Sequence, residues 1–357
     1  MSAINPRFSK EIKKFGGFDF NACYNCGNCT AICNLSDEHN SFPREMLRFS
    51  VLGLQDEIKS SLKPWLCYYC GECTTHCPQT ANPGELMMSL RRWLISKYDW
   101  TKLSGLFYKS VFAMLLAFVL IAAGVVAFGA LKNFQAITVM HYGHLFEMVA
   151  IGGVFLVILL PNILRMWYYS IGSKNLKFNL KNYLATAKEL FIHMFTQKQT
   201  RICDDSKENT IWWFEHFILV IGYLMLLFVT VFLNWFETNS NLVIYAGYIF
   251  SSIIFIVTFD FVVRRMRKRT EKSTFSHFSD WFFVIWLFLM GLSAFTVRLL
   301  IDADLLENHF WVYLVHLTIL VQWALIIVPF GKWTHFLYRS FAMYFSAVMD
   351  KSEKKAG

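Results

Sequence analysis

Two runs of cysteines constrain this chain more than any other feature of its sequence. The second run, residues 67–78, reads Cys-Tyr-Tyr-Cys-Gly-Glu-Cys-Thr-Thr-His-Cys-Pro, and the first run, residues 23–33, repeats the cysteine spacing without the proline. Three thiolates at equal steps of three can hold three corners of one cubane iron–sulfur cluster, while a fourth, displaced cysteine reaches the other cluster. Eight of the nine cysteines lie in these two runs. The spacing therefore predicts two [4Fe–4S] clusters.

Each predicted cluster takes three ligands from one run and its fourth ligand from the other run. One cluster would be held by Cys23, Cys26, Cys29 and Cys77. The other cluster would be held by Cys67, Cys70, Cys73 and Cys33. Zinc sites and disulfides are the alternatives. Four ligands complete a zinc site, so zinc would not require two matched runs of this kind.

Composition divides the chain into parts of different kinds. Of its 357 residues, 55% are hydrophobic and only 17% are charged, which is too apolar for one soluble globule. The cysteines lie almost entirely before residue 78, and the long apolar runs lie after residue 104. We therefore expect a ferredoxin-like domain with a membrane hinge over 1–104, a membrane domain over 105–340 and a cytoplasmic tail over 341–357.

Helix signals on both sides of the second cysteine run favour an all-α domain. The stretch 34–66 carries apolar residues at roughly helical steps, which does not suit a small β-rich ferredoxin. After the second run, Asn82-Pro83 predicts the start of a helix. That helix should end in the segment 91–100, where basic residues mixed with Trp and Tyr indicate a membrane surface. We place the hinge between the two domains there.

Six apolar stretches are each near the length needed to cross the hydrocarbon core of a membrane. They lie at about 106–131, 145–169, 211–235, 242–263, 281–301 and 309–332. The segments 164–210 and 264–272 are rich in Lys and Arg, whereas the alternate loops are almost free of positive charge. The positive-inside rule then places both termini and the iron–sulfur domain on the cytoplasmic side of the inner membrane. The same basic segments explain the net charge of +9 without nucleic acid as a partner.

Histidines near the ends of these spans are candidate haem ligands. An imidazole in lipid is costly unless it has a partner, and neutral imidazoles can bind haem iron from opposite sides. His216 and His335 share the predicted cytoplasmic leaflet, and we expect them to bind one haem b. His316 shares the outer leaflet with His141 and His144, one of which would complete a second haem site. The alternative for each is a histidine that snorkels to the membrane surface.

Two parts of the chain resemble known families. Residues 15–95 resemble the helical two-cluster ferredoxin subunit of heterodisulfide reductases, and the second cysteine run with Pro78 matches its motif fully. Residues 329–335, Pro-Phe-Gly-Lys-Trp-Thr-His, resemble the end of the last haem helix in the gamma subunit of respiratory nitrate reductases. In that family the partner helix carries both remaining ligands, whereas the third span here has His216 but no second histidine.

A fusion of these two parts resembles the C subunits of quinone-interacting membrane-bound oxidoreductases. The resemblance implies soluble partner subunits of the heterodisulfide reductase type, with flavin and iron–sulfur groups. It also implies a menaquinone-like pool as the other redox partner and a role in sulfur metabolism.

The sequence thus predicts the electron-transfer subunit of a quinone-interacting oxidoreductase, with no catalytic residue assigned. It would pass electrons between the menaquinone pool and a cytoplasmic complex through b haems and two clusters. One alternative is a related conduit for a different soluble reductase, linked to sulfite or to a disulfide. The other is a haem-free iron–sulfur membrane anchor with a redox-sensing role.

Overall fold

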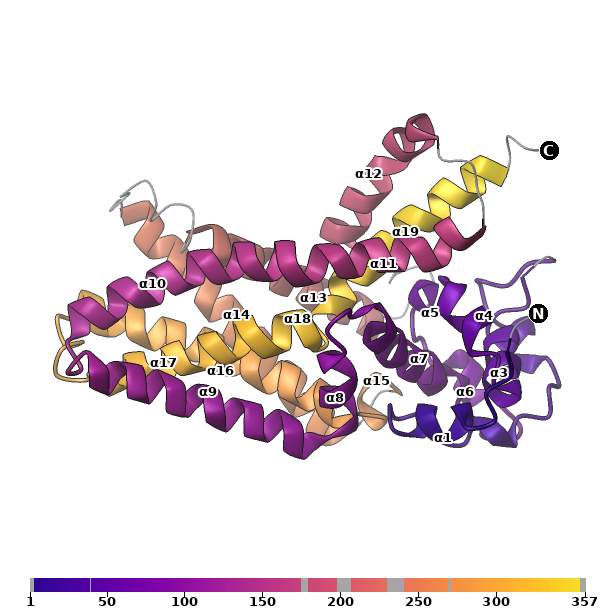
Figure 1. The fold of residues 1–357 in the computed structure, drawn as a ribbon, viewed down its shortest axis with the longest axis horizontal. Helices are drawn as coiled ribbons and strands as arrows, with labels where there is room; N and C mark the ends of the chain where they lie inside the picture. Colours follow the sequence, from indigo (N-terminus) through magenta and orange to yellow (C-terminus); the bar gives the residue numbers. More distant parts are fainter. Residues whose placement is uncertain are drawn as a thin grey trace.

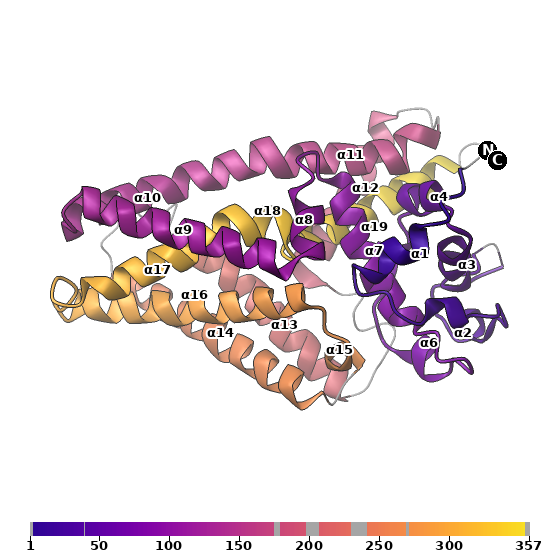
Figure 2. The same cartoon turned by 60° about the horizontal axis from the view of Figure 1, so that its bottom comes forward.

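Every regular element in the described part of the chain is helical, so the expected all-α class is confirmed. The computed structural model describes residues 3–38, 40–174, 179–197, 207–229, 241–268 and 271–353. A bundle of long helices meets, at one end, a domain of short helices that carries the cysteine runs (Figure 1). The first described helix and the end of the last described helix both lie at the end of the molecule where the short helices are (Figure 1 and Figure 2).

The cysteine domain is built from short helices joined by loops. In chain order these are α1 (Phe8–Lys13), η1 (Phe20–Ala22), α2 (Asn28–Ala31), α3 (Arg44–Leu52), α4 (Gln55–Ser60), α5 (Lys63–Leu66), α6 (Glu72–Thr75) and α7 (Pro83–Tyr98). α7 begins at Pro83, as the sequence predicts. The Asn82 side chain forms no capping hydrogen bond to this helix, and its amide nitrogen donates to Asp19 (Nδ2–Oδ2 3.1 Å).

Six helices of the described part are long and apolar enough to cross a membrane. The first, fourth and fifth are α9 (Val111–Leu131), α14 (Asn241–Arg267) and α16 (Phe278–Asp302). The second combines α10 (Ala136–Gly153), η2 (Val154–Leu159) and α11 (Leu160–Ser170). The third is α13 (Lys207–Leu227). The sixth combines α17 (Phe310–Gln322), η6 (Trp323–Ile327), α18 (Val328–Phe330) and α19 (Thr334–Glu353).

Shorter helices connect the spans. α8 (Leu103–Lys109) leads from the cysteine domain into α9, and α12 (Leu180–Thr196) lies between the second and third spans. α15 (Glu271–Thr274) lies between α14 and α16. The expected end of the third span, residues 230–235, lies outside the described residues.

Two of the spans contain a π-helical turn just before a proline. η2 precedes Pro161, the second residue of α11, and η6 precedes Pro329, the second residue of α18. Proline lacks a backbone N–H, and its ring clashes with the carbonyl one turn earlier. The wider π turn relieves this clash and lets each helix continue through the proline.

The last span continues into a long packed helix. The backbone leaves the helical conformation at Gly331 (φ −103°, ψ −162°) and becomes helical again as α19. Ala342, Phe345 and Val348 of α19 are 0%, 4% and 2% exposed, and α19 packs against α12 and α5. Because these apolar residues share one helix face, most of the expected tail over 341–357 is part of a packed helix.

The segment 91–100, where we expected the hinge, connects the cysteine domain to the spans through buried ion pairs. Arg92 of α7 is 6% exposed, so it lies inside the protein rather than at a membrane surface. Its guanidinium pairs with Glu85 (Nη1–Oε1 2.9 Å) and with Asp280 near the start of α16 (Nη2–Oδ2 3.0 Å). Arg92 can be buried because carboxylates from α7 and from a distant span pair with it.

Gly291 allows α14 and α16 to pack closely, so replacing it should weaken the bundle. A Cβ at Gly291 would lie 2.8 Å from the backbone nitrogen of Phe255 and 2.9 Å from Ile254 Cγ2. We expect Gly291→Ala to lower the free energy of unfolding by about 1–3 kcal/mol through overpacking, as measured by thermal unfolding in detergent. Gly247→Ala is the matched control, because a Cβ there meets nothing within 4 Å. Equal stability of the two variants would contradict this close approach.

Candidate functional site

The two cysteine runs adopt the same local fold. In each run a glycine with positive φ follows the second cysteine: Gly27 (φ +96°) precedes α2, and Gly71 (φ +93°) precedes α6. Glycine takes this left-handed conformation without steric cost. The turn places the third cysteine of each run, Cys29 or Cys73, in the first turn of a short helix. The repeated spacing in the sequence thus produces a repeated backbone turn.

Four cysteines from both runs form what we call the first cysteine group. They line one small cavity of about 20 Å³ and are Cys23, Cys26, Cys29 and Cys77. Burial raises the pKa of the Cys29 thiol to about 11, and the negative charges of Cys23, Cys26 and Cys77 contribute to this rise. Cys77 of the second run therefore lies with three cysteines of the first run.

The other four cysteines form the second cysteine group. They are Cys33, Cys67, Cys70 and Cys73. Burial raises the pKa of Cys73, and the charges of Cys67 and Cys70, followed by those of Cys29 and Cys33, add to the effect. Four thiolates that oppose one another's ionisation fit a metal cluster, because its cationic iron would offset this repulsion.

A cavity of about 410 Å³ lies where the cysteine domain meets the spans. This volume is within the range of about 300 to 1,000 Å³ that is usual for cofactor sites. His216 of α13, His335 of α19 and Cys70 of the second group all line it. Its aromatic lining includes Tyr108, Tyr223, Phe283, Trp323 and Trp333. Its basic lining is Arg91, Arg92, Arg264, Arg265, Lys332 and Arg339. Two imidazoles from different helices, an aromatic wall and cations for carboxylates together fit a haem b.

Asp280 is the centre of a buried network of charges beside this cavity. It is 4% exposed, and it pairs with Arg92, with Lys332 (Nζ–Oδ1 2.8 Å) and with Arg265 (Nη1–Oδ2 4.0 Å). The same carboxylate accepts a hydrogen bond from the backbone N–H of His277 at the start of α16 (N–Oδ2 3.2 Å). Burial opposes the charge on Arg92, but Asp280 and Glu85 outweigh it and raise the pKa of Arg92.

Arg91 holds the backbone that leads into the second cysteine run. It is 4% exposed, and its guanidinium donates to the carbonyls of Pro64 (Nε–O 2.6 Å), Trp65 (Nη2–O 3.4 Å) and Cys67. No carboxylate in the described part of the chain forms an ion pair with it. Burial, followed by the positive charge of Arg339, lowers the pKa of Arg91 to about 9.

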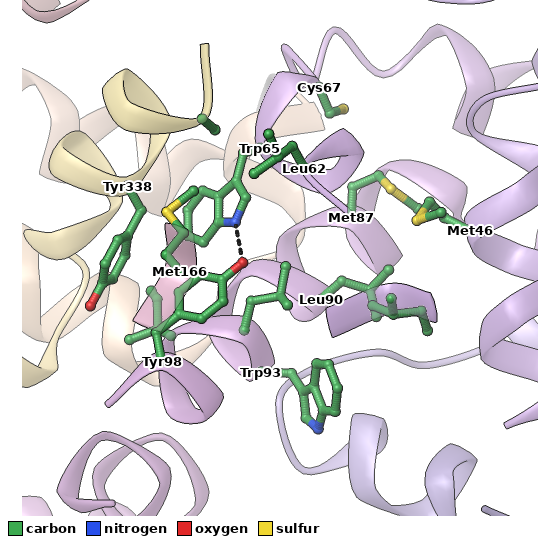
Figure 3. Close-up of a cluster of buried hydrophobic side chains, with 14 of the residues drawn as sticks. Met46, Leu62, Trp65, Cys67, Met87, Leu90, Trp93, Tyr98, Met166 and Tyr338 are labelled. Carbon is green, nitrogen blue, oxygen red and sulfur yellow. Dashed lines mark hydrogen bonds between the residues drawn. The ribbon is translucent and has the colours of Figure 1, made fainter. Parts of the chain in front are cut away.

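A buried tryptophan connects the second cysteine group with His335. Trp65 lies two residues before Cys67, and its ring centroid is 5.8 Å from that of His335 and 5.6 Å from that of Tyr338. Its Nε1 donates to the Tyr98 hydroxyl at 3.4 Å (Figure 3). Sequence reasoning missed Trp65 and Arg91. The available signal for Trp65 was its position immediately upstream of a predicted ligand.

His316 has a different neighbour from the ones we expected. Its Nδ1 lies 2.9 Å from Ser293 Oγ of α16, while His144 pairs with Glu147 (Nδ1–Oε2 3.7 Å) and His141 is exposed on α10. Among the residues that the structure describes, no hydrogen bond, ion pair or ring contact joins His316 to His141 or His144. The second haem site stays a prediction.

Cys77 offers a test of how the ligands are divided between the clusters. We expect Cys77→Ser to perturb the same cluster signal in electron paramagnetic resonance (EPR) spectra as Cys29→Ser, because both line one cavity. Cys33→Ser should perturb the other signal. Cys203→Ser, at the one cysteine outside the runs, serves as the control and should leave both signals and the iron content unchanged. A Cys77→Ser spectrum that matched Cys73→Ser instead would contradict the division.

Comparisons with known proteins concern the cysteine domain. Residues 22–82 match the family model described as a 4Fe-4S dicluster domain. The chain is 31% identical over 96 residues to an Archaeoglobus profundus protein named as similar to the C subunit of heterodisulfide reductase, covering 27% of this chain and 51% of that protein. It is 36% identical over 76 residues to the C subunit of the H(2):CoB-CoM heterodisulfide,ferredoxin reductase of Methanothermobacter thermautotrophicus, covering 21% and 41%.

The chain therefore spans about half the length, or less, of these curated relatives. Neither relative's name refers to a membrane-spanning part. No solved structure matches the chain.

Proposed function

We propose that this chain is the membrane electron-transfer subunit of an oxidoreductase. It passes electrons between a menaquinone-type pool and a cytoplasmic complex that contains flavin and iron–sulfur groups. The observation that carries this proposal is the shared cavity of His216, His335 and Cys70. Candidate haem ligands on two spans and a candidate cluster ligand of the cysteine domain face the same space. A haem-free anchor with a sensing role would not need this arrangement.

The two cysteine groups have different surroundings, and these suggest the order in which electrons would pass through them. The first group would hold one cluster and the second group the other, and His216 with His335 would hold a haem b. These groups supply the one-electron carriers. Cys70 of the second group lines the membrane-side cavity, whereas Cys26 of the first group is exposed. The first group is therefore the place where a soluble partner would exchange electrons.

The cavity lining suits a bound haem in two ways. Its aromatic side chains would shield a bound haem from water, which would lower the local dielectric and strengthen the interactions between charges. Its basic side chains, among them Arg264, Lys332 and Arg339, would pair with the carboxylates of a haem b through charge-assisted hydrogen bonds.

The comparisons and the basic residues support the proposed partner and location. The relatives are named after the C subunits of heterodisulfide reductases, which supports a soluble partner of that type. Arg264, Arg265 and Arg267 lie in the last turn of α14, and two of them reach the cavity beside the cysteine domain. The positive-inside rule then supports a cytoplasmic cysteine domain on the inner membrane.

Reduction by a quinol tests this function in the purified full chain. A menaquinol analogue should produce the absorption of a reduced b-type haem, and the EPR signal of a reduced cluster should follow. A protein without haem absorption would overturn the proposal. Haem reduction by dithionite but not by the quinol would overturn the role of the quinone pool.

A further inference from the structure

Two neighbouring arginines of α7 are buried in opposite electrostatic situations. Arg91 and Arg92 are 4% and 6% exposed. Arg92 is neutralised by Glu85 and Asp280. The hydrogen bonds of Arg91 go to Met88 Sδ and to the carbonyls of Pro64, Trp65 and Cys67. Carbonyl dipoles satisfy its N–H groups, but they do not cancel its charge. Within the part of the chain that the structure describes, Arg91 therefore carries a buried positive charge with no paired carboxylate.

This charge lies between the two candidate redox sites. Arg91 contacts Cys67 of the second cysteine group through the backbone carbonyl, and its guanidinium lies 5.9 Å from the ring centroid of Trp65. Trp65 in turn lies against His335, and Arg91 lines the cavity that His335 lines. The guanidinium is ionised at any physiological pH, and its burial leaves little solvent to screen it.

We propose that Arg91 raises the reduction potential of the cluster held by the second cysteine group. This inference rests on the proposed function. A cubane with four thiolate ligands is anionic, and it becomes more negative by one charge when it accepts an electron. A fixed cation nearby favours the reduced form, because two charges attract strongly where the effective dielectric constant is low. Cluster potentials are known to respond to such local charge and hydrogen bonding.

The functional consequence concerns the step between the membrane and the cysteine domain. The second group is the one nearer to the haem candidates, so its cluster would receive or deliver electrons across the cavity. Raising its potential makes it a better acceptor of electrons that arrive from the membrane. The basic residue that lines the cavity of the first cysteine group, Arg44, is partly exposed to solvent. Solvent therefore screens its charge more than it screens that of Arg91.

Redox titration of the cluster EPR signals in the purified full chain tests the inference. We expect Arg91→Gln to shift the one-electron equilibrium of the second-group cluster toward oxidation by about tenfold or more, which is a drop of about 59 mV. Arg91→Lys, titrated at mildly acidic pH where even a buried amine stays protonated, keeps the charge and should stay within about threefold of the unmodified protein. Arg44→Gln removes a charge beside the first group and should leave the potential of the second-group cluster unchanged.

The two variants distinguish an effect of the Arg91 charge on the cluster potential from an effect of the substitution on the structure. A potential that is unchanged in Arg91→Gln, or that falls equally in Arg91→Lys, would show that the charge does not set it. If Arg91→Gln failed to assemble its cluster, Arg91→Lys would decide: a retained potential supports the inference, and a tenfold drop overturns it. These readings use only the cluster signals. A protein with clusters but without haem would therefore refute the proposed function and still answer this question.

Discussion

Replacing His335 with alanine is expected to abolish the reducible b-type haem absorption of the purified protein and to leave both clusters in place. If His335 and His216 hold the haem iron, removing one of them would take away half of the ligands that the protein supplies. His335 and His216 line the same cavity, so His216→Ala should have the same effect. Optical spectra with and without reductant measure the haem, and EPR spectra of the same samples count the clusters.

His309→Ala is the matched control for this experiment. His309 is exposed at the start of α17, and its Nδ1 lies 3.2 Å from the Leu305 carbonyl oxygen of its own chain segment. The haem absorption should therefore be unchanged in this variant. Retention of the full haem spectrum in both His335→Ala and His216→Ala would refute the assignment of the cavity. Loss of the clusters in His335→Ala would show that the variant is misfolded, and His216→Ala would then decide.

Asp280→Asn is expected to destabilise the contact between the cysteine domain and the spans by about 3–5 kcal/mol, the usual cost of breaking a buried ion pair. The substitution keeps the shape of the side chain but leaves its buried cationic partners without a counter-charge. These partners are Arg92, Lys332 and Arg265. Thermal unfolding of the detergent-solubilised protein, followed by circular dichroism, should show a clearly lower midpoint.

Asp56→Asn provides the comparison for Asp280→Asn. Asp56 pairs with Lys59 in the same short helix at 2.9 Å, and the two side chains are 46% and 31% exposed. Exposed pairs of this kind contribute about 0–1 kcal/mol, because solvent screens them. We expect little change in the unfolding midpoint. If the two variants were equally stable, the Asp280 network would not hold the domains together.

The predictions that hold best depend on short stretches of chain. The two runs share their cysteine spacing and the glycine after the second cysteine, which are features of only a few residues. Gly27 and Gly71 accordingly take the same backbone conformation. The start of α7 at Pro83 and the apolar lengths of the spans are likewise local properties. Residues 341–353 were harder to predict. Their helix is stabilised by packing against α12 and α5, which are distant in the sequence.

By itself, the sequence determined the all-α class, the two matched sets of thiols and the six apolar helices, because each depends on residue type at a fixed local spacing. Only the tertiary structure decided what those parts face. It placed His216, His335 and Cys70 around one cavity, and it gave His316 a serine as its neighbour. It also gave the adjacent Arg91 and Arg92 different electrostatic surroundings, because, among the described residues, carboxylates pair with Arg92 and not with Arg91. Whether a buried charge is compensated depends on groups brought together by folding, and no pattern along the chain records that.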